Sequence, residues 1–304
     1  MNPSQGRRTA LVTGGTDGIG KEIARGLASQ GLQVILVGRD RAKGSAAEDD
    51  IRRTSNTPYV EFLAADLSLM REVGRLADAV TARCPTLHCL VHSAGIVRGR
   101  RLVTEEGIES NFAINYLARF ALTEWLLPLL RAGARPNRAA RVLLVSGAAR
   151  GGRVYFEDPN LGTNFSTLRV VLQSCRANDL FALEQARRLM SDSPPPRIVM
   201  NCLKLGVIKT SIRREFPWWM KLLVPLLFDP FLEQTPSQAA DAALRLLLGD
   251  EFEGVTGALF SRIRTFRQLA TAARAPDFVD ARRLWKLSER MVANALSRVA
   301  VAAE

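Results

Sequence analysis

Short apolar segments alternate along this chain with longer segments whose apolar residues recur at helical spacing. The first apolar segment, residues 8–13, ends in a glycine-rich turn, and the helical pattern of residues 22–28 follows directly. A second apolar segment covers residues 33–38. Strands that alternate with helices favour a parallel sheet with helices on both faces. The pattern therefore predicts an α/β fold.

The turn between the first strand and the first helix reads Gly-Gly-Thr-Asp-Gly-Ile-Gly. Here Gly14 permits a tight bend, Gly18 lets the backbone approach a pyrophosphate, and Gly20 lets the helix pack closely on the strand. The phosphates are then expected at the helix N-terminus. Glycines alone are also typical of an ordinary turn, but a second strand after one helix is what a dinucleotide-binding unit requires. We therefore predict a single doubly wound Rossmann domain that binds a dinucleotide.

The residues after the second strand select the cofactor. An NAD site places an acidic residue there, whereas this chain has Arg39, followed by Asp40 and, close behind, Lys43. A guanidinium pairs with a phosphate in a bidentate way, so Arg39 is suited to a 2′-phosphate. NADP(H) is therefore the predicted cofactor. In the alternative reading, Asp40 binds the ribose and Arg39 is a solvated surface charge.

Longer motifs follow in order, and they are Asp66-Leu-Ser, Leu90-Val-His-Ser-Ala-Gly-Ile96, and residues 104–130, 177–189 and 201–210. With the glycine turn, they make the chain similar to the short-chain dehydrogenase/reductase family over nearly its whole length. Within that family it most resembles the retinol dehydrogenase-like branch. The resemblance implies a set of cofactor-binding residues: Gly14, Thr16, Asp17, Gly18, Ile19, Gly20, Arg39, Asp66, Leu67, Ser93, Ala94, Gly95, Arg176, Gly206, Ile208 and Thr210.

The same resemblance implies where the reaction takes place. In the family, a Tyr phenol exchanges a proton with the substrate oxygen, and a Lys four residues later lowers the Tyr pKa and holds the nicotinamide ribose. A Ser positions the carbonyl, and an Asn, here Asn115, supports a water linked to the Lys. By register, the Tyr, Lys and Ser positions hold Leu172, Arg176 and Gly147. Only the Asn is kept.

No shifted alignment restores the pair, because none of the three tyrosines is followed four residues later by a lysine. Leu does not transfer protons, and Arg is effectively always protonated, so Arg176 is suited to binding ribose but not to tuning an acid. Two substitutes stay open against plainer structural roles: Ser146 in place of Gly147, and Tyr155 as the acid. The Pro-Gly of the family's nicotinamide loop is Leu205-Gly206 here.

Composition agrees with one domain over residues 1–304. The chain is 47% hydrophobic and 24% charged, which allows a large core. The first seven residues lack an apolar segment, so no secretory signal is expected. The four cysteines and two histidines are not spaced as metal ligands, so we expect no metal, reduced thiols and a cytoplasmic location.

The formal net charge of +12 permits contact with nucleic acid or an anionic membrane. The basic residues are nevertheless spread along the chain without a clustered stripe or a nucleic-acid motif. We expect a solvated arginine-rich surface and no specific nucleic-acid partner, with weak membrane-surface contact left open.

Residues 216–232 follow Thr210, at the point where the family builds its variable substrate lid. The segment is rich in large apolar side chains, including Trp218 and Trp219, but Lys221 and Pro225 interrupt it. It is too short to span a bilayer. We expect a lid over an apolar pocket for a small molecule, and the alternatives are a membrane-surface anchor and packing in the core or in a homodimer.

Leu172 and Gly147 are expected to line the same pocket. Residues 277–304 show the spacing of an amphipathic helical region, which we expect to pack on the core.

These observations leave three hypotheses. In the first, the chain is an enzyme that binds NADP(H) and an apolar small molecule and catalyses a redox-neutral rearrangement, cyclisation or elimination, with Asn115 and Arg176 supplying electrostatics. In the second, it is a divergent oxidoreductase with a substitute proton donor. In the third, it is a noncatalytic NADP(H)-binding protein.

Overall fold

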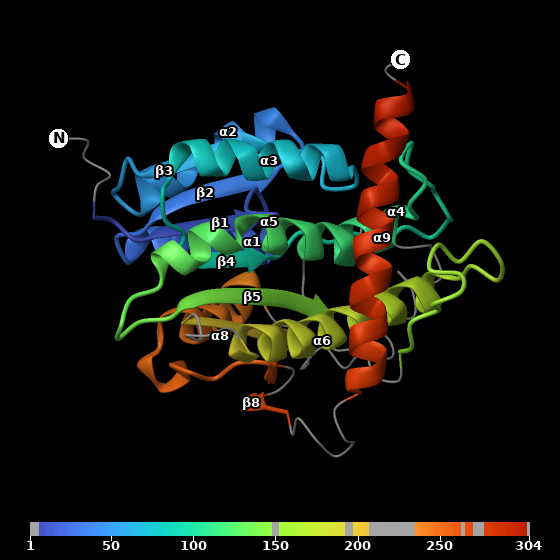
Figure 1. Ribbon diagram of the computed structural model, residues 1–304. Helices are drawn as coiled ribbons and strands as arrows, with labels where there is room; N and C mark the ends of the chain where they lie inside the picture. Colours follow the sequence, from blue (N-terminus) through green and yellow to red (C-terminus); the bar gives the residue numbers. More distant parts are fainter. Residues whose placement is uncertain are drawn as a thin grey trace.

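The computed structural model describes residues 6–147, 152–191, 197–206, 235–262, 265–269 and 277–302. These residues form one eight-stranded sheet in the order β3-β2-β1-β4-β5-β6-β7-β8, with helices on both faces (Figure 1). The strands are β1 (Thr9–Thr13), β2 (Gln33–Gly38), β3 (Val60–Ala64), β4 (Cys89–His92), β5 (Ala140–Gly147), β6 (Ile198–Leu205), β7 (Leu259–Arg262) and β8 (Phe266–Gln268). Neighbouring strands from β3 to β7 are parallel, and β8 is antiparallel to β7. The predicted doubly wound α/β fold is confirmed.

The central strands are apolar without interruption because both of their faces are covered. Every residue of β1 is buried, and β1 pairs with β2 on one side and with β4 on the other. Ala10 is thus aligned with both Val34 and Cys89. The strand order changes direction at β1, so the carboxyl ends of β1 and β4 flank the position where doubly wound sheets bind ligands.

Two apolar cores lie on the two faces of the sheet. One core joins the strands to α1 (Gly18–Ser29), α2 (Arg41–Thr54) and α8 (Pro236–Leu248). The other joins them to α3 (Met70–Arg83), α5 (Ala118–Gly133) and α6 (Thr167–Ser191). Three short elements complete the description: α4 (Ser110–Phe112), the π-helix η1 (Ala113–Leu117) and the 3₁₀ helix η4 (Asp250–Phe252).

The C-terminal helix α9 (Phe278–Ala302) packs across the helices of the second core (Figure 1). Its Leu284 and Trp285 are buried, and the Trp285 ring meets Phe120 edge-on with 5.0 Å between ring centroids. This helix lies in the region predicted to be helical and to pack on the core.

Within the described ranges, no helix has an apolar stretch that could cross a lipid bilayer. The same ranges hold no cluster of His, Cys, Asp and Glu side chains arranged to bind a metal. The predicted lid at 216–232, with Trp218 and Trp219, lies outside the described residues, as do Ile208 and Thr210.

Candidate functional site

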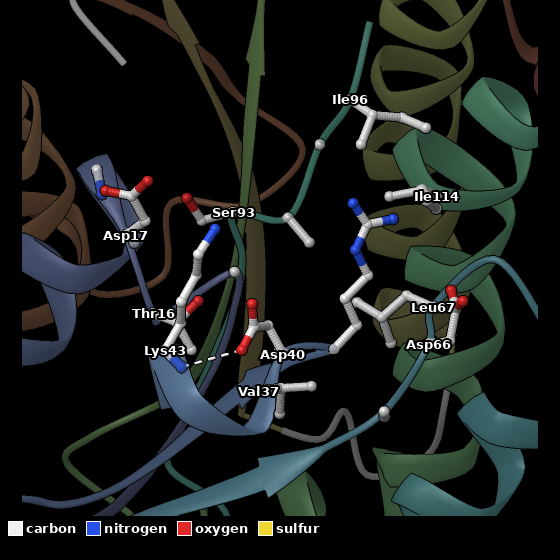
Figure 2. Close-up of a pocket in the computed structure, with 18 of the residues that line it drawn as sticks. Thr16, Asp17, Val37, Asp40, Lys43, Asp66, Leu67, Ser93, Ile96 and Ile114 are labelled. Carbon is white, nitrogen blue, oxygen red and sulfur yellow. Dashed lines mark hydrogen bonds between the residues drawn. The ribbon is translucent and has the colours of Figure 1, made fainter. Parts of the chain in front are cut away.

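A cleft of about 400 Å³ lies at the carboxyl ends of β1, β2 and β4 (Figure 2). Its position next to the change in strand order is the one that doubly wound folds use for nucleotides. Its lining includes every residue before position 100 that the sequence predicts to bind the cofactor: Gly14, Thr16, Asp17, Gly18, Ile19, Gly20, Arg39, Asp66, Leu67, Ser93, Ala94 and Gly95.

Two glycines of the turn have no room for a side chain. Gly14 has a φ of +67°, and a Cβ on it would lie 2.7 Å from the Ala94 amide nitrogen. A Cβ on Gly20 would lie 2.2 Å from the carbonyl oxygen of Gly14. The turn therefore lies directly against the segment after β4, and a larger residue at either position would push apart two walls of the cleft.

The start of α1 forms the floor between these walls. Asp17 caps the helix by accepting a 2.7 Å hydrogen bond from the Gly18 amide, and the first turn of α1 contains no acidic residue. The positive end of the helix dipole and the unpaired amides of a first turn favour an anion. This part of the cleft suits a pyrophosphate.

Cations gather at the end of the cleft beside β2. Arg39 and Lys43 both line it, and both are exposed (Figure 2 labels Lys43). Asp40, the acidic residue of the alternative reading, uses one carboxylate oxygen to cap α2, because it accepts a 3.0 Å hydrogen bond from the Lys43 amide. Two cations beside an acid that caps a helix suit a 2′-phosphate better than a free ribose.

Several lining residues were absent from the predicted set: Val37, Gly38, Asp40, Lys43, Ala65, Ile96 and Ile114. The sequence could have indicated the residues at strand ends, because the carboxyl ends of all parallel strands lie at the same edge of a sheet. Nothing in the sequence indicated Ile114. It reaches the cleft from the π-helix η1, and only the tertiary structure brings that element there.

Asn115 lies in the same π-helix and holds the wall of the cleft. Its Oδ1 accepts a hydrogen bond from the Ile96 amide and its Nδ2 donates to the Ile96 carbonyl, both at 2.8 Å. Its backbone carbonyl accepts a 2.9 Å hydrogen bond from Asn178 Nδ2 on α6. The side chain is therefore committed to positioning the segment after β4.

One face of α6 lies against the end of β5. The Sγ atom of Cys175 is 3.4 Å from where a Cβ on Gly147 would lie. Arg176 points elsewhere, because its Nη2 forms a 3.0 Å ion pair with Asp277 and it does not line the cleft.

A buried arginine lies behind the cleft wall, between β4, β5 and α6. Arg119 Nη1 donates to the Val145 carbonyl at 2.8 Å, and Nη2 donates to the Ala94 carbonyl at 2.7 Å. Nη1 also lies 3.4 Å from Asn178 Oδ1. Burial lowers the pKa of Arg119 to about 10, so the guanidinium remains protonated near neutral pH.

Comparison with known proteins agrees with this geometry. A family model described as short chain dehydrogenase matches residues 8–154. Mouse retinol dehydrogenase 13 is 33% identical over 294 residues, covering 95% of this chain and 85% of that protein. Human polyprenol dehydrogenase is 31% identical over 256 residues, covering 84% and 77% of the two chains. The chain belongs to the short-chain dehydrogenase/reductase family, in its retinol dehydrogenase-like branch.

Solved structures share the fold. The Pseudomonas aeruginosa RhlG/NADP active-site complex superposes with a TM-score of 0.65 at 25% identity, covering 91% of this chain and 99% of that one. That structure is a complex with NADP at the active site.

Family membership makes the position of Cys175 informative. Successive residues on a helix point about 100° apart, so a shift of one residue moves a side chain to a different face. Cys175 faces Gly147, and Val171 lies four residues earlier on the same face of α6. We infer from this contact a second register, in which Cys175 and Val171 take the Lys and Tyr positions of the family, while the register of Arg176 and Leu172 stays a prediction. Neither register contains a Tyr or a Lys.

The two substitute groups have different surroundings. Ser146 is buried near the end of β5 and is aligned with Lys204 of β6. Tyr155 is half-buried, and the Arg153 guanidinium lies 4.7 Å from the centre of its ring. Gly206 directly follows β6 but does not line the cleft. Neither substitute lines the cleft, so their catalytic roles stay predictions.

Proposed function

We propose that this short-chain dehydrogenase/reductase binds NADP(H) in the cleft and takes an apolar small molecule without the family's usual proton transfer. The cofactor assignment rests on two cations, Arg39 and Lys43, which line the same cleft as the glycine turn and the start of α1. When bound, the nicotinamide would supply a hydride donor or acceptor. The NADP in the related Pseudomonas structure supports this choice of cofactor.

The names of the relatives support an apolar substrate. Retinol and polyprenol are both isoprenoid alcohols, and dehydrogenases for them are the relatives described above. The described part of the cleft agrees, since its lining includes the apolar side chains of Ile96 and Ile114. We therefore propose an isoprenoid-like or similarly apolar ligand, with residues 216–232 as its lid.

The proposed reaction leaves the nicotinamide in one oxidation state. Hydride transfer to a carbonyl needs a proton for the oxygen, and positioned proton donation is typically worth ~10²–10⁴-fold in rate. In the register inferred from the contact between Cys175 and Gly147, Val171 and Cys175 stand at the two positions that supply and tune that proton in the family. A redox-neutral rearrangement, cyclisation or elimination avoids this requirement.

A second candidate is a divergent oxidoreductase. The relatives named as dehydrogenases favour it, and Ser146 or Tyr155 would then replace the missing donor. The two candidates differ in whether product formation consumes NADPH.

The cofactor assignment is tested by calorimetric titration of NADPH and NADH into wild type, Arg39→Asp and Arg41→Asp. A charge-assisted hydrogen bond contributes about 1.5–3 kcal/mol, so Arg39→Asp should weaken NADPH binding tenfold or more. Arg41 is exposed and does not line the cleft, so Arg41→Asp makes the same charge change without removing the contact. Equal losses in both variants, or equal wild-type affinity for the two dinucleotides, would refute the assignment.

The chemistry is tested by following nicotinamide absorbance and product together while isoprenoid alcohols and aldehydes are supplied. Product without any change in nicotinamide absorbance supports the redox-neutral proposal. Stoichiometric oxidation of NADPH with an aldehyde, or stoichiometric reduction of NADP⁺ with an alcohol, establishes the oxidoreductase instead. Saturable NADPH binding with no product from any of these ligands points to a noncatalytic binder.

A further inference from the structure

The buried guanidinium of Arg119 has no use in the chemistry proposed so far. Arg119 is only 6% exposed, and its Nε atom has no hydrogen-bond partner among the described residues. The groups that hold it are two backbone carbonyls and the amide of Asn178, none of which carries a net charge. A buried charge without a counter-charge is costly, so its presence calls for a reason.

No carboxylate in the described parts of the chain forms an ion pair with Arg119. Asp179, the residue after Asn178 on α6, is committed to Lys204 at 2.7 Å, and that pair is neutral as a whole. Two cysteines, Cys202 and Cys175, would favour the Arg119 charge if they ionised. Burial raises the pKa of Cys202 far above its usual value, so this thiol supplies no negative charge. Among the described residues, the surroundings of Arg119 keep a net positive charge.

This charge lies at a defined end of the cleft. Arg39 and Lys43 mark the adenosine end, and the glycine turn and α1 mark the pyrophosphate. In the family, the nicotinamide end lies beside the Ser and Lys positions, and here Gly147 and Cys175 lie together at the carboxyl end of β5. Arg119 Nη2 donates to the carbonyl of Ala94 and lies 3.9 Å from where a Cβ on Gly95 would be. Arg119 Nη1 donates to the carbonyl of Val145, two residues before Gly147, at 2.8 Å, so the guanidinium lies between the described cleft and the expected nicotinamide end.

We propose that Arg119 makes the site select the reduced cofactor. The nicotinamide ring carries a positive charge in NADP⁺ and none in NADPH, so a fixed cation behind the ring repels the oxidised form. The interaction is only weakly screened, because Arg119 and the wall in front of it exclude water. The inference rests on the proposed binding of NADP(H), and it agrees with a cofactor that stays in one oxidation state.

The proposal also accounts for the residue at the Lys position of the family. A lysine at 175 would bring a second cation next to Arg119, and like charges in a poorly hydrated site disfavour each other. Cys175 avoids this repulsion. The positive charge at this end of the cleft thus comes from α5 instead of α6.

The experiment measures the dissociation constants of NADP⁺ and NADPH for each protein and takes their ratio. Wild type should bind NADPH more tightly. Arg119→Gln keeps amide donors for the carbonyls but removes the charge, and it should lower the ratio about three- to tenfold. Arg119→Lys keeps the charge but loses the fork of hydrogen bonds, and it should hold the ratio within about twofold of wild type.

Thermal unfolding separates this role from a structural one. Both Arg119 variants lose hydrogen bonds and should melt below wild type, whereas only Arg119→Gln should change the ratio. Cys175→Asp offers an independent route, because a carboxylate near the guanidinium should lower the ratio while Arg119 is intact.

The outcomes distinguish failure of the inference from failure of the proposed function. No binding of either dinucleotide to wild type would refute the proposed function itself. If wild type binds NADP⁺ and NADPH tightly and with a ratio near one, the role of Arg119 is refuted but the binding of NADP(H) is not. This result needs only wild type, so it holds even if every variant fails to fold. A ratio that falls equally in Arg119→Lys and Arg119→Gln would show that the hydrogen bonds, not the charge, are responsible.

Discussion

Two arginines are buried at opposite ends of the same sheet, and they are held in different ways. Arg141, at the amino end of β5, is 2% exposed and forms a 2.7 Å ion pair with Glu253. It also donates to the carbonyls of Leu246 and Gly249, both at 2.8 Å. Within the described residues, Arg119, at the carboxyl end, is held by carbonyls and an amide alone.

The difference separates a structural charge from one available to a ligand. The cofactor cleft lies at the other end of the sheet from Arg141, and neutralising the charge of Arg141 lowers the cost of burying it. At the carboxyl end the cleft lies behind Ala94, and an acidic partner would cancel the field there. We interpret the missing partner of Arg119 as a cost to stability that serves the cofactor site.

The largest expected effect comes from restoring the family's proton-transfer groups at the carboxyl end. In the register inferred from the contact between Cys175 and Gly147, this is Gly147→Ser, Val171→Tyr and Cys175→Lys, combined with Arg119→Gln to remove the second cation. Because proton donation is worth ~10²–10⁴-fold, NADPH-dependent reduction of a retinal-like aldehyde should rise by about 10²-fold. The rate is measured from the loss of nicotinamide absorbance.

The matched control for the restored site uses the register predicted from the sequence, with Gly147→Ser, Leu172→Tyr and Arg176→Lys. These side chains lie on a different face of α6, so this variant should gain nothing. If the control variant reduces the aldehyde faster than the restored variant, the register inferred from Cys175 and Gly147 is wrong. Wild type that already reduces the aldehyde as fast as the restored variant would indicate a substitute donor.

At the amino end, Arg141→Met should lower the free energy of unfolding by about 3 kcal/mol, because it leaves two carbonyls and a partly buried Glu253 without their partner. Urea denaturation measures the change. Arg75→Ala removes an ion pair whose arginine side chain is 74% exposed and should change stability by less than about 0.5 kcal/mol. If Arg141→Met and Arg75→Ala lower the free energy of unfolding by similar amounts, the buried ion pair of Arg141 stabilises the fold no more than the exposed pair of Arg75.

A smaller effect is expected from acid. Burial opposes ionisation of Glu253, but the hydrogen bond from the Ala139 amide and the ion pair with Arg141 outweigh it and hold the pKa of Glu253 below its usual 4.5. A lowered carboxyl pKa stabilises the fold above the unfolded pKa, and this contribution is lost as the pH falls through the folded value.

Wild type should therefore lose more thermal stability than Glu253→Gln between pH 6 and pH 3, by about 2–4 °C in melting temperature. Arg119 has no carboxylate partner in the described structure, so Arg119→Gln should leave the acid dependence as in wild type. If the loss of melting temperature in acid disappears in Arg119→Gln, then Arg119 has an ionised carboxylate partner. The contrast drawn between Arg141 and Arg119 would then be wrong.

The sequence determined the fold class and the phosphate end of the cleft. Apolar segments that alternate with helical patterns predicted the parallel sheet, because strands covered on both faces must be apolar throughout. The glycines at 14, 18 and 20 predicted the turn, since backbone conformation and close approach there are local demands that a sequence displays directly. Arg39 was recognisable for the same reason, because it follows the second strand by one residue.

Only the tertiary structure decided the nicotinamide end. Which face of α6 meets β5 depends on the packing of a long helix, and a shift of one residue in register exchanges Arg176 for Cys175. Nothing in the sequence indicated Arg119, because its importance comes from the carbonyls of Val145 and Ala94 and from the lack of an acidic partner in the described part of the structure. A buried charge is defined by what surrounds it in space, and chain order does not record those neighbours.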